Sequence, residues 1–136
     1  MIKDNKILEI LKLKNIAVVG ASIKIDRPSY FVSLYMLQNG YKIIPVNPSY
    51  NNIFNLKCYP NLESIKHNID IVNIFRKSKY VLPIVLSGIR IKAKAIWMQD
   101  GVVDHEAKKL AKNAGLRVIM DNCLLREHRI NHKKLI

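Results

Sequence analysis

The sequence predicts an α/β protein: a single Rossmann-like, doubly wound domain with a five-stranded, mainly parallel sheet. Short β-branched apolar runs alternate along the chain with segments whose apolar residues recur at helical spacing. Strands that alternate with helices imply right-handed βαβ crossovers and hence a parallel sheet. The 136 residues leave room for one domain, which we expect to span 1–136 with its core at about 7–129 and a basic C-terminal tail.

Each predicted element has its own sequence pattern. Compact apolar runs bounded by turn residues predict five strands, at residues 16–19, 41–46, 69–75, 93–98 and 116–120. Apolar residues at helical spacing predict helices at residues 6–14, 30–38, 61–66, 79–90 and 103–114.

In the first half of the chain, local signals set the expected boundaries. Gly20 ends the first strand, and Ser29 is expected to cap the helix that follows. Pro45 is expected to end the second strand early, because proline donates no ladder hydrogen bond. Residues 49–60 are expected to be irregular, with a turn at Asn51-Asn52.

In the second half, charged residues add further signals. The polar Asp70 and Asn73 of the third strand are expected to be tolerable near a sheet edge. The helix at 103–114 carries acidic residues at its start and lysines later, which suits the helix dipole. The tail, residues 121–136, is mixed, and its basic stretch is expected to be solvated.

The composition points to an anionic partner. Lys and Arg number 23 against 10 Asp and Glu, giving a formal net charge of +13. Such a balance fits nucleic acid, a membrane surface or a polyphosphate ligand. No apolar run approaches the roughly 18 residues of a membrane span. Cys58 and Cys123 form no CxxC pair, so we expect no zinc site or disulfide, and a cytoplasmic setting.

A ligand is expected beyond the carboxyl ends of the strands, where the strand order reverses. After the first strand, Gly20 permits a tight turn and Ser22 offers a hydroxyl to a phosphate. The full GxGxxG fingerprint is absent, and Asn47-Pro48 stands where an acidic residue would bind a ribose, which disfavours a nicotinamide cofactor. From spacing alone, a plain strand-to-loop turn at Gly20 explains the sequence equally well.

Several blocks together resemble the small stand-alone CoA-binding proteins of bacteria and archaea. The blocks occur in order along the chain: IAVVGAS with DRPS at 16–22 and 26–29, IPVNP at 44–48, KCYP at 57–60, IVNIFR at 71–76, AKAIWMQDGV at 93–102, and DNC with EH at 121–123 and 127–128. These proteins are similar to the N-terminal CoA-binding domain of the succinyl-CoA synthetase α subunit. The resemblance covers nearly the whole chain and implies a Rossmann-like fold that binds CoA.

The resemblance also implies the residues of a CoA site. Gly20, Ala21 and Ser22 would contact the phosphates, with Arg27 and Pro28 in the same loop. Val46, Asn47 and Pro48 would flank the adenosine or ribose. Phe75 and Arg76 would line the middle of the cleft, and Gln99, Gly101 and Val102 the pantetheine side. The phosphates of CoA favour Arg and Lys at the rim, and no acidic residue occurs between Arg27 and Leu62.

This sequence departs from the family pattern at a few positions. Ile23 and Ile25 replace prolines of the first loop, and Lys92 replaces a glycine that ends the third helix. If that position keeps φ > 0, Lys92 costs roughly 1 kcal/mol. Asp100 takes a usually apolar position beside the pocket, where a carboxylate could repel phosphate.

Other reactive or aromatic side chains have simpler interpretations. We expect Cys58 and Cys123 to be small buried hydrophobes rather than nucleophiles, and Trp97 to lie in the core. Phe31, with Tyr30 and Tyr35, is expected to pack its helix, although Tyr30 could touch a ligand. His128 is expected to be a surface or packing residue of an exposed segment.

Three functions remain in view. The first is a binder of CoA or acyl-CoA without catalytic machinery of its own, acting as a carrier, a sensor or the partner of an acyl-CoA-using enzyme. The second is a basic nucleic-acid-binding module, which the lack of a helix-turn-helix or RNP-like motif disfavours. The third is an accessory or degenerate acyl-CoA ligase subunit.

Overall fold

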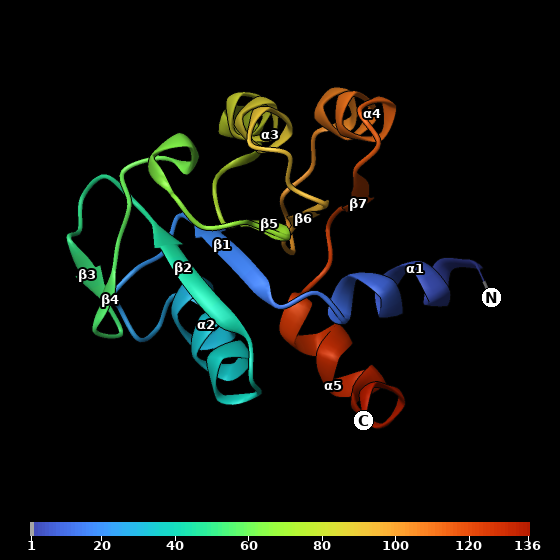
Figure 1. Ribbon diagram of the computed structural model, residues 1–136, viewed down its shortest axis with the longest axis horizontal. Coiled ribbons are helices and arrows are strands. Elements are labelled where there is room, and N and C mark those ends of the chain that lie inside the picture. The colour runs from blue at the N-terminus through green and yellow to red at the C-terminus, as the bar shows by residue number, and fades with distance from the viewer. Residues whose placement is uncertain (1) are drawn as a thin grey trace.

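The computed structural model describes residues 2–136, with side chains from Lys6 onward, and confirms the predicted fold class (Figure 1). All neighbouring strands of the main sheet run parallel, in the order β2-β1-β5-β6-β7. These strands span Lys42–Val46, Asn15–Val19, Ile71–Ile74, Ala95–Met98 and Arg117–Ile119, in that order. The strand order reverses between β1 and β5, so this pair forms the topological switch point.

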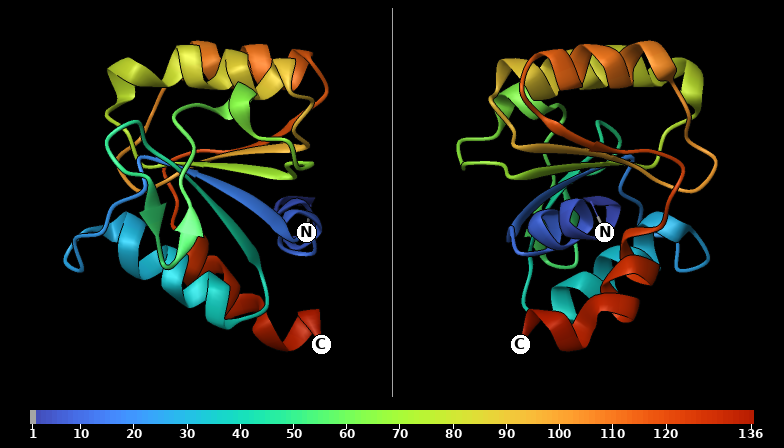
Figure 2. Two further views of the ribbon diagram at one scale, coloured as in Figure 1. Left: turned by 60° about the vertical axis from the view of Figure 1, so that its left-hand side comes forward. Right: turned by 90° about the vertical axis from the view of Figure 1, so that its right-hand side faces the viewer.

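Helices cover both faces of the sheet (Figure 2). One face carries α3 (Val81–Arg90) and α4 (His105–Asn113). The other carries α1 (Ile2–Leu11), α2 (Pro28–Gln38) and α5 (Leu124–Leu135). No helix of the described chain is long and apolar enough to cross a membrane.

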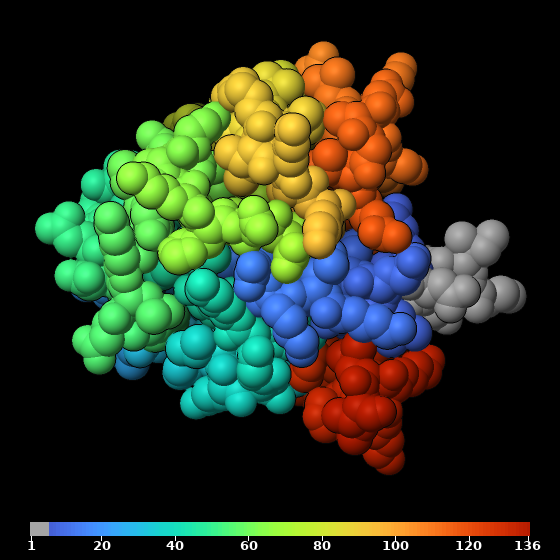
Figure 3. Space-filling view, in the orientation of Figure 1, coloured from blue at the N-terminus to red at the C-terminus, as the bar shows by residue number. Residues whose placement is uncertain are grey.

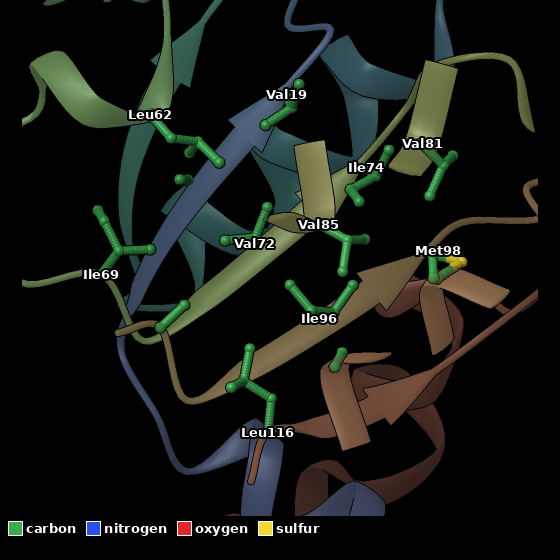
Figure 4. Close-up of a cluster of buried hydrophobic side chains, with 14 of the residues drawn as sticks. Val19, Leu62, Ile69, Val72, Ile74, Val81, Val85, Ile96, Met98 and Leu116 are labelled. Carbon is green, nitrogen blue, oxygen red and sulfur yellow. The ribbon is translucent and has the colours of Figure 1, made fainter. Parts of the chain in front are cut away.

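The strands are apolar on both faces because both faces are buried. Val72, Ile74, Ile96 and Met98 face α3, where Val85 meets them (Figure 4). The alternate residues of the same strands face the other helices, and among them Trp97 is fully buried, as predicted. Its indole Nε1 donates a hydrogen bond of 2.9 Å to the carbonyl of Asn122.

The second strand and its exit differ from expectation. Pro45 does not end β2 early; the strand continues to Val46, because β2 is an edge strand and tolerates a missing donor. The segment expected to be irregular contains a hairpin of β3 (Asn52–Ile53) and β4 (Leu56–Lys57). The hairpin turns at Phe54 and Asn55, both at φ near +60°. A short 3₁₀ helix, η1 (Leu62–Ser64), replaces the predicted helix at 61–66.

The third strand of the sequence prediction lies at the centre of the sheet, not near an edge. Asn73 lies on β5, between β1 and β6, and is 1% exposed. Asp70 precedes this strand, where it accepts a hydrogen bond from the Asn15 amide and pairs with Lys94 at 3.3 Å. A 3₁₀ helix, η2 (Ser78–Tyr80), comes before α3.

The basic residues of the C-terminal segment, Arg126, Arg129, Lys133 and Lys134, are exposed as predicted, but the segment is helical. It forms α5, which contacts both α1 and α2 (Figure 3). His128, expected on an exposed segment, is only 4% exposed, and its Nδ1 shares a hydrogen bond of 2.8 Å with the Tyr35 hydroxyl. The basic residues of the segment occupy the outer face of this helix.

Candidate functional site

A cleft of about 730 Å³ opens at the switch point, beyond the carboxyl ends of β1 and β5. Every residue implied by the family resemblance lines this cleft except Val46 and Pro48. Those two line a neighbouring hollow of about 320 Å³, which shares Gly20, Asn47, Arg76 and Tyr80 with the cleft. The two hollows therefore form one continuous site.

Gly20 sets the shape of the cleft floor. Its φ is +89°, and a Cβ atom there would lie 2.8 Å from the carbonyl oxygen of Phe75, at the end of β5. A side chain would meet backbone that cannot give way easily, so this position requires glycine. The close approach also keeps the space directly above β1 and β5 open.

Asn47 connects the exits of β1 and β2. Its Nδ2 donates a hydrogen bond of 2.8 Å to the carbonyl of Ala21, and its Oδ1 accepts one of 2.9 Å from the Ser49 amide. The side chain predicted to flank a ribose thus also fixes the loop that follows β1.

The start of α2 faces the cleft without a side-chain cap. Ser29, predicted as the cap, lies inside the helix and is buried; Arg27 takes the N-cap position, and Pro28 begins the helix. The first turn has no acidic residue. A helix start of this kind favours a bound anion, because its amide groups and dipole present positive charge.

Four cationic side chains line the cleft: Lys24, Arg27, Arg76 and Lys77. The Arg76 guanidinium lies 4.8 Å from the centre of the Tyr80 ring, a stacking that holds its planar group at the junction of the two hollows.

Asp100 is the single acidic residue among the described residues that line the cleft. Arg126 of α5 pairs with both of its carboxylate oxygens, at 3.0 and 2.8 Å. Hydrogen bonding to Arg126 lowers the pKa of Asp100, and the same pair neutralises the charge. The repulsion of phosphate expected at this position is therefore offset.

At the β6 end of the cleft, polar groups are already engaged. The Gln99 Oε1 accepts a hydrogen bond of 3.0 Å from the Leu124 amide, at the start of α5. The Gly101 amide donates to Asp121 Oδ1 at 2.7 Å. Gln99 thus serves mainly to anchor α5, and its side chain is 4% exposed.

The two cysteines differ. Cys58 is buried, as expected, and burial raises the pKa of its thiol. Cys123 is not buried but partly exposed, and it lines the cleft. No group of three or more potential metal ligands was found among the described residues.

Sequence reasoning missed several residues of the cleft wall, including Lys24, Phe31, Tyr50, Lys77 and Tyr80. Lys24 lies two positions after the predicted Ser22, and Lys77 directly follows the predicted Arg76. Their proximity in the sequence could therefore have identified them. Phe31 was expected to pack its helix, yet it is 48% exposed.

A doubly wound sheet with a basic cleft at its switch point defines a protein that binds a phosphate-bearing ligand. The chain matches the CoA binding domain model over residues 14–129 and belongs to that family. It is 40% identical to the uncharacterized protein YneT of Bacillus subtilis over 92% of this chain and 93% of that protein.

A solved structure shares this fold. A hypothetical protein from Pyrococcus horikoshii OT3 superposes with a TM-score of 0.90 at 38% identity, covering 93% of this chain and 90% of that chain.

The chain is also 28% identical to the ADP-forming acetate–CoA ligase of Methanocaldococcus jannaschii over 90% of its own length. That match covers 18% of the ligase, so the chain corresponds to one part of a much longer enzyme.

Proposed function

We propose that this protein binds CoA or acyl-CoA in the continuous site at the switch point. The observation that carries the proposal is the chemistry of the cleft wall: four cations, an uncapped helix start and a neutralised carboxylate face one space. This set of donors fits a diphosphate, and membership of the CoA-binding domain family supports CoA as the ligand class.

The two hollows suit different parts of CoA. The diphosphate would lie over Gly20 and the start of α2, within reach of Arg27. The adenosine would enter the smaller hollow, against Val46 and Pro48. The pantetheine arm would extend along Gly101 and Val102 toward Cys123.

We further propose that the protein acts without a catalytic centre of its own, as a carrier, a sensor or the partner of an enzyme that uses acyl-CoA. The ADP-forming ligases support the last role, because this chain matches only one part of them. His128, the side chain most suited to proton transfer, packs against Tyr35 instead of lining the cleft.

Isothermal titration calorimetry tests CoA binding, with NAD and ATP as competing candidates and protein freed of ligand beforehand. We expect CoA to bind with one site per chain, and Arg76→Ala to weaken binding by about ten- to a hundredfold, since hydrogen bonds to charged groups contribute about 1.5–3 kcal/mol.

Arg129→Ala is the matched control, because Arg129 is exposed on α5 and lines neither hollow. Absence of heat with CoA, or an equal loss in both variants, would contradict the proposal.

A further inference from the structure

One large exposed apolar side chain lines the cleft, and two more flank a cleft residue in the chain. Phe31 lines the cleft, and Ile23 and Ile25 are 53% and 74% exposed on the connection between β1 and α2. This connection projects from the body of the molecule (Figure 2), and Lys24, between the two isoleucines, lines the cleft. We call Ile23, Ile25 and Phe31 the apolar rim. Single exposed apolar residues are common, but a group beside a ligand cleft marks a binding surface.

Phe31 lies at the Cys123 end of the cleft. It is one helical turn before Tyr35, on the side of α2 that meets α5 through His128. Leu124 is likewise one turn before His128, and Cys123 directly precedes it. Phe31 and Cys123 therefore stand at the same level of two adjacent helices, and both line the cleft.

The pantetheine thiol of CoA would point toward this end under the function proposed above. Asp100, which lines the cleft beside Gly101, is already paired, since it binds Arg126 through both oxygens. A charged acyl group would find no free partner in that pair, whereas an alkyl chain would cover the apolar rim. Burying apolar surface is favourable in proportion to its area.

We propose that the apolar rim binds the acyl chain of an acyl-CoA thioester, so that the protein prefers apolar acyl-CoA to free CoA. This inference rests on the proposed CoA binding. Full burial of one methylene contributes about fourfold in affinity. The rim is open to solvent on one side, so about twofold per methylene is expected.

The test compares CoA, acetyl-CoA, hexanoyl-CoA and succinyl-CoA by calorimetry. We expect hexanoyl-CoA to bind about 16-fold more tightly than acetyl-CoA, because it has four more methylenes, and succinyl-CoA to gain nothing over acetyl-CoA. Phe31→Ala should remove most of the hexanoyl preference, measured as the ratio of hexanoyl-CoA to CoA affinity within the same variant. Ile25→Ser provides a second variant at a more exposed position, and Ile130→Ser, 68% exposed on α5, is the matched control.

The outcomes separate the two proposals. Binding of CoA without any gain from the hexanoyl chain, or a gain that survives Phe31→Ala, overturns the acyl-chain inference alone. Failure of CoA and all thioesters to bind overturns the CoA proposal as well. Light scattering measures the oligomeric state of the native protein and of Phe31→Ala. If the native protein is a dimer and Phe31→Ala is a monomer, the apolar rim binds a second copy of the chain, and the acyl-chain inference is overturned.

Discussion

Two glycines with similar backbone angles separate the effect of close packing from that of strain. Gly20 and Gly115 have φ of +89° and +91°, but a Cβ atom would meet the Phe75 carbonyl only at Gly20. Gly115→Ala should therefore lower the free energy of unfolding by about 1 kcal/mol and leave CoA binding unchanged. Gly20→Ala should cost more and weaken CoA binding, as measured by urea unfolding and calorimetry.

Equal losses of stability in the two variants would show that the contact with Phe75 carries no cost. Unchanged CoA affinity in folded Gly20→Ala protein would remove Gly20 from the site.

At the residue scale, some local signals predicted the structure, whereas Ser29 is not a cap and Pro45 does not end its strand. Lys92 has φ of +62°, which fits the position of a family glycine. The sequence also identified Asp100 as a carboxylate beside the cleft. It did not show that Arg126 pairs with it, because the two residues lie far apart in the chain and meet only through the packing of α5.

At the scale of elements, α5 shows why the apolar pattern failed. The residues that this helix buries include His128 and Asn131, which carry no hydrophobic signal. The hairpin of β3 and β4 was missed for a different reason. Each strand has only two residues, too few to display alternation, and Phe54 is a residue that rarely adopts positive φ. The longer strands and helices, with strong apolar periodicity, were predicted to within a few residues.

His128 makes the packing of α5 dependent on pH. Burial lowers the pKa of His128, and nearby His132 and Lys14 lower it further; Tyr35 and Tyr41 also face the ring. Above the ordinary value of about 6.5, histidine is neutral in both the folded and the unfolded chain. As pH falls through 6.5, the unfolded chain takes up a proton that folded His128 resists, so stability decreases.

Urea unfolding between pH 8 and pH 5 measures this effect. The free energy of unfolding should fall with pH in the native protein, and the fall should be smaller in His128→Gln. His105→Gln, on exposed α4 surface, serves as control and should keep the native slope. An unchanged slope in His128→Gln would contradict the assignment.

For the molecule as a whole, the parallel sheet followed from alternating elements, but the strand order did not. Polar residues suggested an edge position for β5, which instead lies at the centre with the Asn73 Oδ1 buried and without a hydrogen-bond partner among the described residues. Strand order depends on which strands pair with each other, and short sequence patterns carry no information about that pairing. The cleft was nonetheless located, because the carboxyl ends of parallel strands share one edge.

The net charge of +13 is that of the whole chain, whereas only four cationic side chains line the cleft. This difference predicts two salt dependences. Nonspecific binding to duplex DNA, carried by scattered lysines, should lose about three to five orders of magnitude in affinity between 50 and 200 mM salt. CoA binding should weaken by less than about tenfold over the same range, because only the few cations and the helix dipole of the cleft are screened by salt, whereas the fit over Gly20 and the apolar walls are not. Fluorescence anisotropy with labelled DNA and calorimetry with CoA measure both. Tight DNA binding that persists at 200 mM salt, with CoA binding lost, would favour a nucleic-acid module instead.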